Sequence, residues 1–240
     1  MPSLVQRELV EGELLGRKTG RGFYDYTPGA ANPAVPEHEP VPLPEGELLR
    51  VHGRGAVAER LCQLLARAYR PSQRRTDSDW SGLEVHGAQL RPTDGRPATQ
   101  LGADVAVFDL PLSDAPGAVL ALAVSERASA AWAEALGQWL HALGWNAQRI
   151  ADALGLVVAR TIAMLINEAA DAVHQGVCDE GAADAAMKLG VNYPQGPFEW
   201  LAGWSAVGVV RLLDSLDAHY RGERYRVSPA LRRRAWKENA

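Results

Sequence analysis

Residues 184–200 read DAAMKLGVNYPQGPFEW, and this stretch indicates two helices joined by a stiff connection. Asp179 is placed to cap the first helix, which runs to Gly190, because an Asp side chain accepts hydrogen bonds from the first free N–H groups of a helix. Pro197 favours the first turn of the second helix, where its missing N–H costs nothing. The connection at residues 193–197 contains two prolines with restricted backbone angles. A short, stiff link between helices is typical of an all-α domain.

The residues on either side of this stretch extend the helical pattern over residues 156–240. Residues 156–175 carry apolar side chains at three- and four-residue steps, and Gly176 provides a stop for that helix. Ser205 is placed to cap a further helix, and Ser228 begins the last one. The sequence therefore predicts five helices that must bury their apolar faces on one another.

Strand and helix patterns alternate in the preceding segment, residues 47–155. Short apolar runs with the length of buried strands lie at 48–51, 105–108 and 118–124, and helices are predicted at 57–68 and 128–143. Residues 70–82 are polar and read as a loop. The β-α-β-β-α order predicts a compact α/β domain with a small, mostly parallel sheet.

The first 46 residues differ from the rest in composition. Residues 27–46 contain six prolines and read as an extended, semi-rigid linker. The start PSLVQRELV (2–10) resembles SPALRRRA (228–235), since both combine a Ser/Pro helix start with Leu and charged residues. The first copy continues into the Gly-rich segment 16–26, whereas the second ends at Ala240. This repeat suggests that residues 1–26 are the tail of a helical domain whose body is absent from the chain.

Composition excludes several classes of protein. The net charge is -4 and the basic residues are scattered apart from short runs such as 232–234, so no nucleic-acid-binding face is expected. Cys62 and Cys178 lie far apart without metal-ligand spacing, which favours a reducing cytoplasm over a disulfide framework or a metal site. The start of the chain does not resemble a signal peptide, and no apolar run approaches the roughly 20 residues that span a bilayer. A cytoplasmic protein without a membrane partner is expected.

Four segments together resemble one known family. They are LGRKTGRGFYDY (15–26), RTIAMLINEAADA (160–172), DAAMKLGVNYPQGPFEW (184–200) and RYRVSPALRRRA (224–235). In order and spacing the last three are similar to the C-terminal domain of 3-hydroxyacyl-CoA dehydrogenases, which serve fatty-acid β-oxidation and phenylacetate catabolism. The first, 15–26, resembles the extreme end of that same domain. The resemblance implies an α/β degenerate Rossmann-like domain followed by an all-α helical domain of the 6-phosphogluconate-dehydrogenase-like C-terminal type. In the family, this helical domain forms the dimer and part of the acyl-CoA cleft.

The resemblance also implies a division of the chain. Some long bacterial members, similar to phenylacetate-pathway 3-hydroxybutyryl-CoA dehydrogenases, carry two helical domains in one chain. On that pattern the sequence resembles the C-terminal half of such a protein, without the N-terminal NAD-binding domain. The expected parts are a tail of a preceding helical domain (1–26), a Pro-rich linker (27–46), a degenerate Rossmann-like domain (47–155) and a helical domain (156–240).

A dinucleotide fingerprint of the form GxGxxA is present at Gly53, Gly55 and Ala58. Glycines at a strand-to-helix turn allow a pyrophosphate to approach the backbone. The fingerprint also requires an acidic residue after a second strand about 20 positions on, and Asp77 and Asp79 lie in the segment read as a loop. The favoured interpretation is an inherited β–α turn, so NAD, the cofactor of the family, is not expected to bind this chain.

The resemblance provides no catalytic residue. The family uses a His–Glu pair, in which His takes the hydroxyl proton, but residues 120–133 contain no histidine. Ala159 stands where the family has an Asn that positions the substrate. The remaining candidates for substrate binding are Arg160, Asn167 and Glu168, and a structural role for Asn167 and Glu168 is the favoured alternative.

Three functional hypotheses follow. In the first, the chain is part of an NAD-dependent 3-hydroxyacyl-CoA dehydrogenase whose chemistry resides in a missing or separately encoded Rossmann domain. In the second, it is a non-catalytic module for acyl-CoA binding or dimerisation. In the third, it is a fragment that associates with itself through an exposed helical face. The expected partners are acyl-CoA and either a second copy or a catalytic Rossmann-domain protein.

Overall fold

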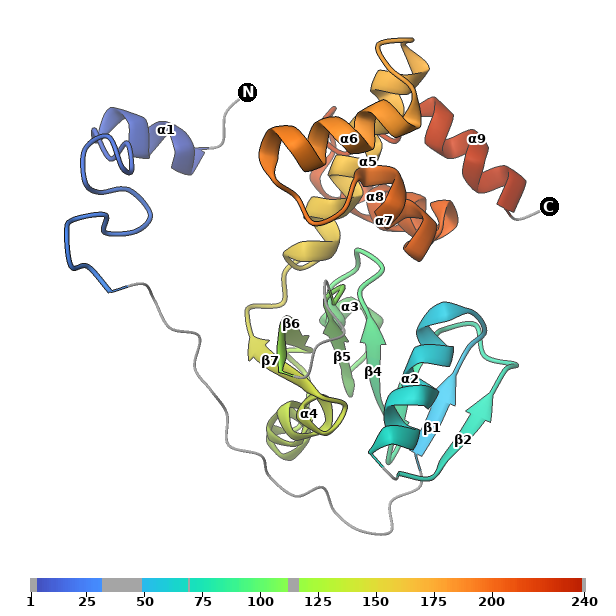
Figure 1. Cartoon of the computed structure of the whole chain (residues 1–240). Helices are drawn as coiled ribbons and strands as arrows, with labels where there is room; N and C mark the ends of the chain where they lie inside the picture. Colours follow the sequence, from blue (N-terminus) through green and yellow to red (C-terminus); the bar gives the residue numbers. More distant parts are fainter. Residues whose placement is uncertain (1–3, 32–48, 69, 112–116, 239–240) are drawn as a thin grey trace. The chain divides into compact units, whose positions relative to one another are not determined.

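The computed structural model describes residues 4–31, 49–68, 70–111 and 117–238 of the 240-residue chain (Figure 1). It contains two compact units, Met1–Glu39 and Pro40–Ala240, and each is described by itself. Of the linker predicted at 27–46, the part from residue 32 onward lies outside the described residues.

The first unit consists of helix α1 (Leu4–Glu11) and a turn-rich segment that follows it. The predicted helix start near residue 3 is confirmed by α1. The turns are held by backbone bridges between Gly16 and Arg21 and between Arg21 and Asp25. No residue of α1 is buried, so within its own unit this helix has no apolar core to cover.

The second unit begins with a mixed sheet of seven strands in the described part of the chain. They are β1 (Leu49–His52), β2 (Ser72–Arg75), β3 (Gly82–Val85), β4 (Ala88–Pro92), β5 (Val105–Phe108), β6 (Ala118–Val124) and β7 (Trp145–Arg149), in the spatial order β2-β1-β3-β4-β5-β6-β7. The pairs β1–β2, β4–β5 and β6–β7 are parallel. The pairs β1–β3, β3–β4 and β5–β6 are antiparallel. The predicted strands at 48–51, 105–108 and 118–124 are confirmed by β1, β5 and β6.

The expectation of a mostly parallel sheet was wrong. The main reason is the hairpin of β3 and β4, whose two-residue turn at His86 and Gly87 has positive φ angles of 51° and 81°, as tight hairpin turns require. The loop predicted at 70–82 was also wrong in part, since β2 runs through it beside β1. Because β2 is a polar strand at the edge of the sheet, it carries no apolar pattern that would predict it.

In the described part of this domain, three helices accompany the sheet: α2 (Ala56–Arg67), α3 (Ala98–Leu101) and α4 (Ala130–Ala142). The predicted helices at 57–68 and 128–143 are confirmed by α2 and α4. Leu61 and Leu65 of α2 join the same buried core as Trp139 of α4. The side chain of Ser129 caps α4 by accepting a hydrogen bond from the Trp132 N–H at 3.2 Å.

Five further helices form the rest of the described chain: α5 (Val158–His174), α6 (Glu180–Val191), α7 (Pro197–Trp204), α8 (Ala206–Tyr220) and α9 (Pro229–Glu238). All five predicted helices are confirmed, including the caps by Asp179 and Ser205. They share a separate apolar core. The fold is therefore a reduced Rossmann-like α/β domain followed by an all-α domain, as the resemblance implied.

The strand directions determine which loops face the helical domain. The pairing makes β1, β2, β4 and β5 run one way and β3, β6 and β7 the other. The loops that follow β1, β4 and β5 therefore lie along one edge of the sheet. Helices α5–α9 gather at one end of the strands (Figure 1). Within the described residues, no helix combines the length and apolar character needed to cross a bilayer.

Candidate functional site

The predicted fingerprint forms a tight turn between β1 and α2. Gly53 and Gly55 have φ angles of 93° and 92°, which glycine adopts readily. The Gly53 N–H donates to the carbonyl of Arg75 at the end of β2, and Ala58 is fully buried. Asp77 follows β2 by two residues, so the interpretation of the preceding residues as a loop was wrong, although the strand is polar and not apolar. The β1–α2–β2 segment thus has the topology of a dinucleotide-binding unit.

The first glycine of this turn is covered by the chain itself. A Cβ atom on Gly53 would lie 2.3 Å from Oγ of Ser81 and 2.8 Å from the carbonyl oxygen of Trp80. In a dinucleotide-binding turn, the first glycine permits the tight turn and the second lets the pyrophosphate approach the backbone. At Gly53, the first glycine, the segment between β2 and β3 packs against the turn, whereas no atom lies within 4 Å of the position that a Cβ would take on Gly55, the second glycine. The absence of NAD binding therefore stays a prediction.

His52 holds the covering segment in position. Its Nδ1 lies 2.6 Å from Oγ of Ser78, and its Nε2 lies 2.9 Å from Oε2 of Glu84. The Trp80 ring stacks on the imidazole with centroids 4.2 Å apart, and the Arg91 guanidinium lies 4.4 Å from the Trp80 centroid. His52 is 8% exposed. Although His and Glu are the pair that the family uses in catalysis, this imidazole presents no free edge to a substrate.

The end of β6 is where the resemblance would place the catalytic histidine. Ser125 is buried there and its hydroxyl accepts the Arg127 N–H at 3.2 Å, while the Glu126 N–H donates to Oγ1 of Thr99. A cavity of about 670 Å³ opens beside this strand end. Asp152 lines it, but its carboxylate already accepts the N–H groups of residues 98 and 99 at 2.7 and 2.8 Å. In the chain segments that the structure describes, no cluster of three or more His, Cys, Asp or Glu could hold a metal ion.

The Asp109 side chain caps the N-terminus of α5. Its side chain is 0% exposed. Oδ2 accepts the N–H groups of Val157 and Val158 at 2.9 and 2.7 Å, and Oδ1 accepts that of Ala159 at 2.7 Å. A helix N-terminus attracts anions through its free N–H groups, and here an internal carboxylate takes them. Sequence reasoning missed Asp109 because its partners lie about 50 residues away, although an acid directly after the apolar run 105–108 was a usable signal.

The three predicted substrate-binding residues do not converge on one cavity. Asn167 is 1% exposed; its Nδ2 donates to the Arg226 carbonyl and its Oδ1 accepts the Ser228 N–H, at 3.0 and 2.7 Å. Glu168 is exposed and Arg160 is partly exposed. The contacts of Asn167 support the structural alternative, in which it fixes the start of α9. A role in substrate binding stays a prediction for all three.

Two family models match the chain side by side. Residues 90–153 match the model described as 3-hydroxybutyryl-CoA dehydrogenase reduced Rossmann-fold domain. Residues 155–239 match 3-hydroxyacyl-CoA dehydrogenase, C-terminal domain. By this pair of adjoining domains, the chain belongs to the 3-hydroxyacyl-CoA dehydrogenase family. The fingerprint at residues 53–58 lies outside both matched regions.

Individual relatives agree with this assignment. A 3-hydroxyadipyl-CoA dehydrogenase of Escherichia coli (strain K12) is 35% identical, over 100% of this chain and 45% of the relative. A crystal structure of 3-hydroxybutyryl-CoA dehydrogenase from Escherichia coli K12 is similar with a TM-score of 0.79 and 33% identity, again over 100% and 45% of the two chains. A probable 3-hydroxybutyryl-CoA dehydrogenase of Bacillus subtilis is 35% identical over 38% of this chain and 32% of its own. The chain thus spans less than half the length of these relatives.

Proposed function

We propose that this chain is a non-catalytic part of an NAD-dependent enzyme that oxidises 3-hydroxyacyl-CoA to 3-ketoacyl-CoA. The hydride transfer then takes place in a Rossmann domain outside the present sequence. The observation that carries the proposal is the capping of α5 by Asp109. The Asp109 carboxylate accepts hydrogen bonds from three N–H groups at the start of this helix, in a chain that matches two adjoining domains of this family. Because the carboxylate accepts these N–H groups, they are not available to an anionic ligand.

The chemistry of the reaction indicates which part of the enzyme this chain provides. Oxidation of the 3-hydroxyl requires a base that takes the proton while hydride leaves for nicotinamide. His52 is enclosed by Trp80, and the turn at Gly53 is covered by Ser81. The chain's contribution is therefore the helical domain, which we assign to the acyl-CoA side of the enzyme. The names of the relatives support an acyl-CoA substrate. A role in β-oxidation or phenylacetate catabolism is part of the proposal and follows from the family resemblance.

A second candidate function is a dimerisation or acyl-CoA-binding module. It is favoured by the apolar residues that α6 and the loop before it leave exposed. Leu189 is 87% exposed, and Val177 and Val191 are exposed as well. Apolar groups in such positions are commonly covered by a partner. The candidate partners are a second copy of this chain or the protein that carries the catalytic Rossmann domain.

The free cysteines support a cytoplasmic location for this enzyme. Cys62 and Cys178 form no disulfide, and both are partly exposed. Partly exposed thiols are kept reduced in the cytoplasm. We therefore place the complete enzyme there, together with the acyl-CoA metabolism in which it is proposed to act.

The test is a calorimetric titration of the purified chain with NADH and, separately, with acetoacetyl-CoA, followed by an assay of NADH consumption. We expect no NADH binding and no turnover. A matched experiment adds the part of the Escherichia coli relative that this chain does not cover, and we expect the chain to raise its turnover. Turnover by the chain alone would overturn the proposal, and acetoacetyl-CoA binding without turnover would favour the second candidate.

A further inference from the structure

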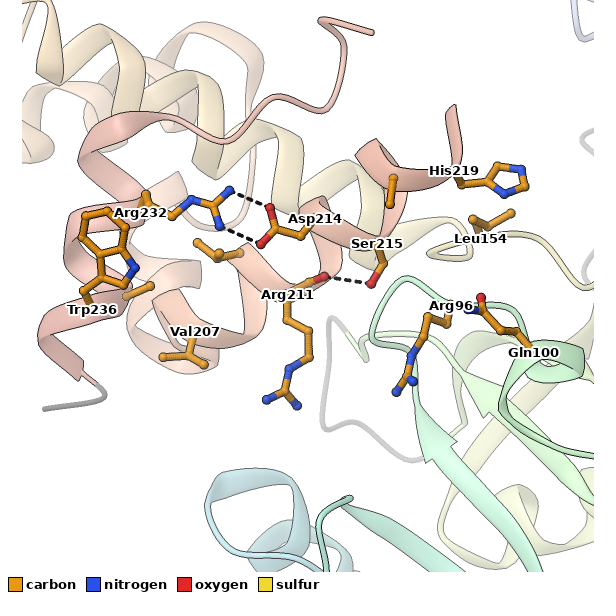
Figure 2. Close-up of a pocket in the computed structure, with 13 residues that line it drawn as sticks. Arg96, Gln100, Leu154, Val207, Arg211, Asp214, Ser215, His219, Arg232 and Trp236 are labelled. Carbon is orange, nitrogen blue, oxygen red and sulfur yellow. Dashed lines mark hydrogen bonds and ion pairs between the residues drawn. The ribbon is translucent and has the colours of Figure 1, made fainter. Parts of the chain in front are cut away.

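A second cavity lies between the helical domain and the loop after β4. Its volume is about 680 Å³, which is in the range of small-molecule sites. Residues of α8 and α9 form one side, and Arg96 and Gln100 form the other (Figure 2). None of the six residues predicted from the sequence to bind cofactor or substrate lines it.

The two sides of this cavity are fixed against each other. Gly95 has a φ of +98°, and a Cβ atom there would lie 2.6 Å from the Leu212 carbonyl oxygen and 2.7 Å from Cβ of Ser215. The loop after β4 is therefore pressed directly onto α8. Arg96, the next residue, donates a hydrogen bond from its Nε to the Asp94 carboxylate at 3.0 Å. This hydrogen bond raises the pKa of Arg96 above its usual value.

The cavity has an excess of positive charge. Arg232 donates both terminal nitrogens to the Asp214 carboxylate at 2.7 and 2.6 Å, so this pair is balanced. Arg211 is exposed and has no ion-pair partner in the part of the chain that the structure describes. Figure 2 shows the Arg211 and Arg96 side chains extending from opposite walls of the cavity. One unpaired guanidinium suits a single planar anion, because guanidinium matches a carboxylate in a two-point contact.

Apolar groups provide the rest of the lining. Val207 and Val210 of α8, Ala235 and Trp236 of α9, and Leu154 contribute aliphatic and aromatic surface. Trp236 is 65% exposed, so its ring is available to a ligand. The cavity therefore offers one free cation beside an apolar wall.

We propose that this cavity binds a small carboxylate with an aliphatic or aromatic tail. The carboxylate binds Arg211, and the tail lies along Val207, Val210 and Trp236. A phosphate dianion fits less well, because Arg96 and Arg232 are already paired with acids. The inference rests on the cavity alone and stands apart from the proposed function.

The experiment is a calorimetric titration of the full chain with hexanoate, with hexanol as the uncharged probe and inorganic phosphate as the tail-free anion. We expect saturable binding of hexanoate only.

Arg211→Gln is expected to weaken hexanoate binding about tenfold, as for loss of a charge-assisted hydrogen bond, and Trp236→Ala is expected to weaken hexanoate binding as well. Arg67→Gln, which removes an exposed arginine outside the cavity, is expected to leave it unchanged. No saturable hexanoate binding, or binding equally strong in Arg211→Gln, would overturn the proposal.

Competition identifies where the carboxylate comes from. Adipyl-CoA carries a carboxylate at the far end of its acyl chain, and hexanoyl-CoA is its uncharged counterpart. Displacement of hexanoate by adipyl-CoA alone supports a carboxylate carried on an acyl group. Displacement by neither supports a free acid as the ligand. Equal displacement by both would mean that the cavity recognises CoA, which contradicts the proposal.

Discussion

The absence of a side chain at Gly53 decides which group covers the turn between β1 and α2. Ser81 and Trp80 approach its Cα so closely that no Cβ atom fits. Gly55, two residues on, has a similar φ but no atom within 4 Å of the position a Cβ would take. The two glycines of one fingerprint therefore differ in their surroundings: Gly53 admits a neighbouring segment, whereas the space over Gly55 is open.

This difference predicts unequal effects of the same substitution. Gly55→Ala strains the backbone alone, at a cost of about 1–3 kcal/mol. Gly53→Ala adds a steric clash and is expected to lose at least about 1 kcal/mol more. The measurement is the free energy of unfolding in urea, followed by tryptophan fluorescence. Equal losses in the two variants would show that the segment with Trp80 does not press on Gly53.

The sequence was informative about single residues only when their partners were local. Asp179 and Ser205 were correctly predicted as caps, because each bonds an N–H three residues away. Asp109 and the contact between His52 and Glu84 were not predicted, since their partners lie tens of residues away and depend on the strand order.

Polar contacts join α5 to the segment that leads into α9. Asp171 on α5 lies 2.7 Å from the Arg226 guanidinium and is mostly buried. Burial raises the pKa of the Asp171 carboxyl, but the nearby Ser228 side chain and the hydrogen bond from Arg226 outweigh it and hold the pKa below the usual value. Asn167 bonds the same segment one turn earlier along α5. The last helix is thus attached through polar contacts as well as through Leu231.

Because the pKa of Asp171 is lowered, the contribution of its contacts to the free energy of unfolding depends on pH. The folded protein holds Asp171 ionised more firmly than the unfolded chain does, so its contribution is complete above the unfolded pKa of about 4 and is lost as the pH falls through the folded value. Asp171→Asn is expected to lower the free energy of unfolding by about 1 kcal/mol at neutral pH. The difference from the unsubstituted chain should shrink at about pH 3, measured by urea unfolding at both pH values. Asp104→Asn, at an exposed position, is the control, and a difference that stays constant with pH would contradict the assignment.

Elements with strong periodicity were predicted well, and weakly patterned ones were not. All five helices of the helical domain carry apolar residues at helical spacing, and each was found. The strands β2 and β7 read SQRR and WNAQR, and polar or mixed edge strands lack the apolar run on which prediction depends. The hairpin of β3 and β4 was missed because its turn residues, His86 and Gly87, are a weaker signal than Asn-Gly or Asp-Gly.

At the scale of the whole molecule, the exposed apolar residues around α6 require an explanation. Leu189 is 87% exposed, and Val177, before the helix, and Val191, at its end, are exposed as well. The purified chain is expected to sediment at least as a dimer at micromolar concentration, since uncovered apolar surface associates in water. Leu189→Glu should shift the chain toward the monomer. Gln195→Glu introduces the same charge at an exposed polar position and should not, and a monomeric unsubstituted chain would contradict the prediction.

Asp109 also couples local opening at the start of α5 to opening at the end of β5. Its carboxylate, attached to the end of β5, holds three amide hydrogens of the first turn of α5, so those amides open to solvent only when the end of β5 opens with them. In a hydrogen-exchange measurement, the amide hydrogens of Val157, Val158 and Ala159 are therefore expected to exchange at the slow rate of a cooperative opening, whereas those of a free helix end exchange quickly through fraying. The segment between β7 and α5 is correspondingly a poor site for proteolytic nicking, although it connects two domains.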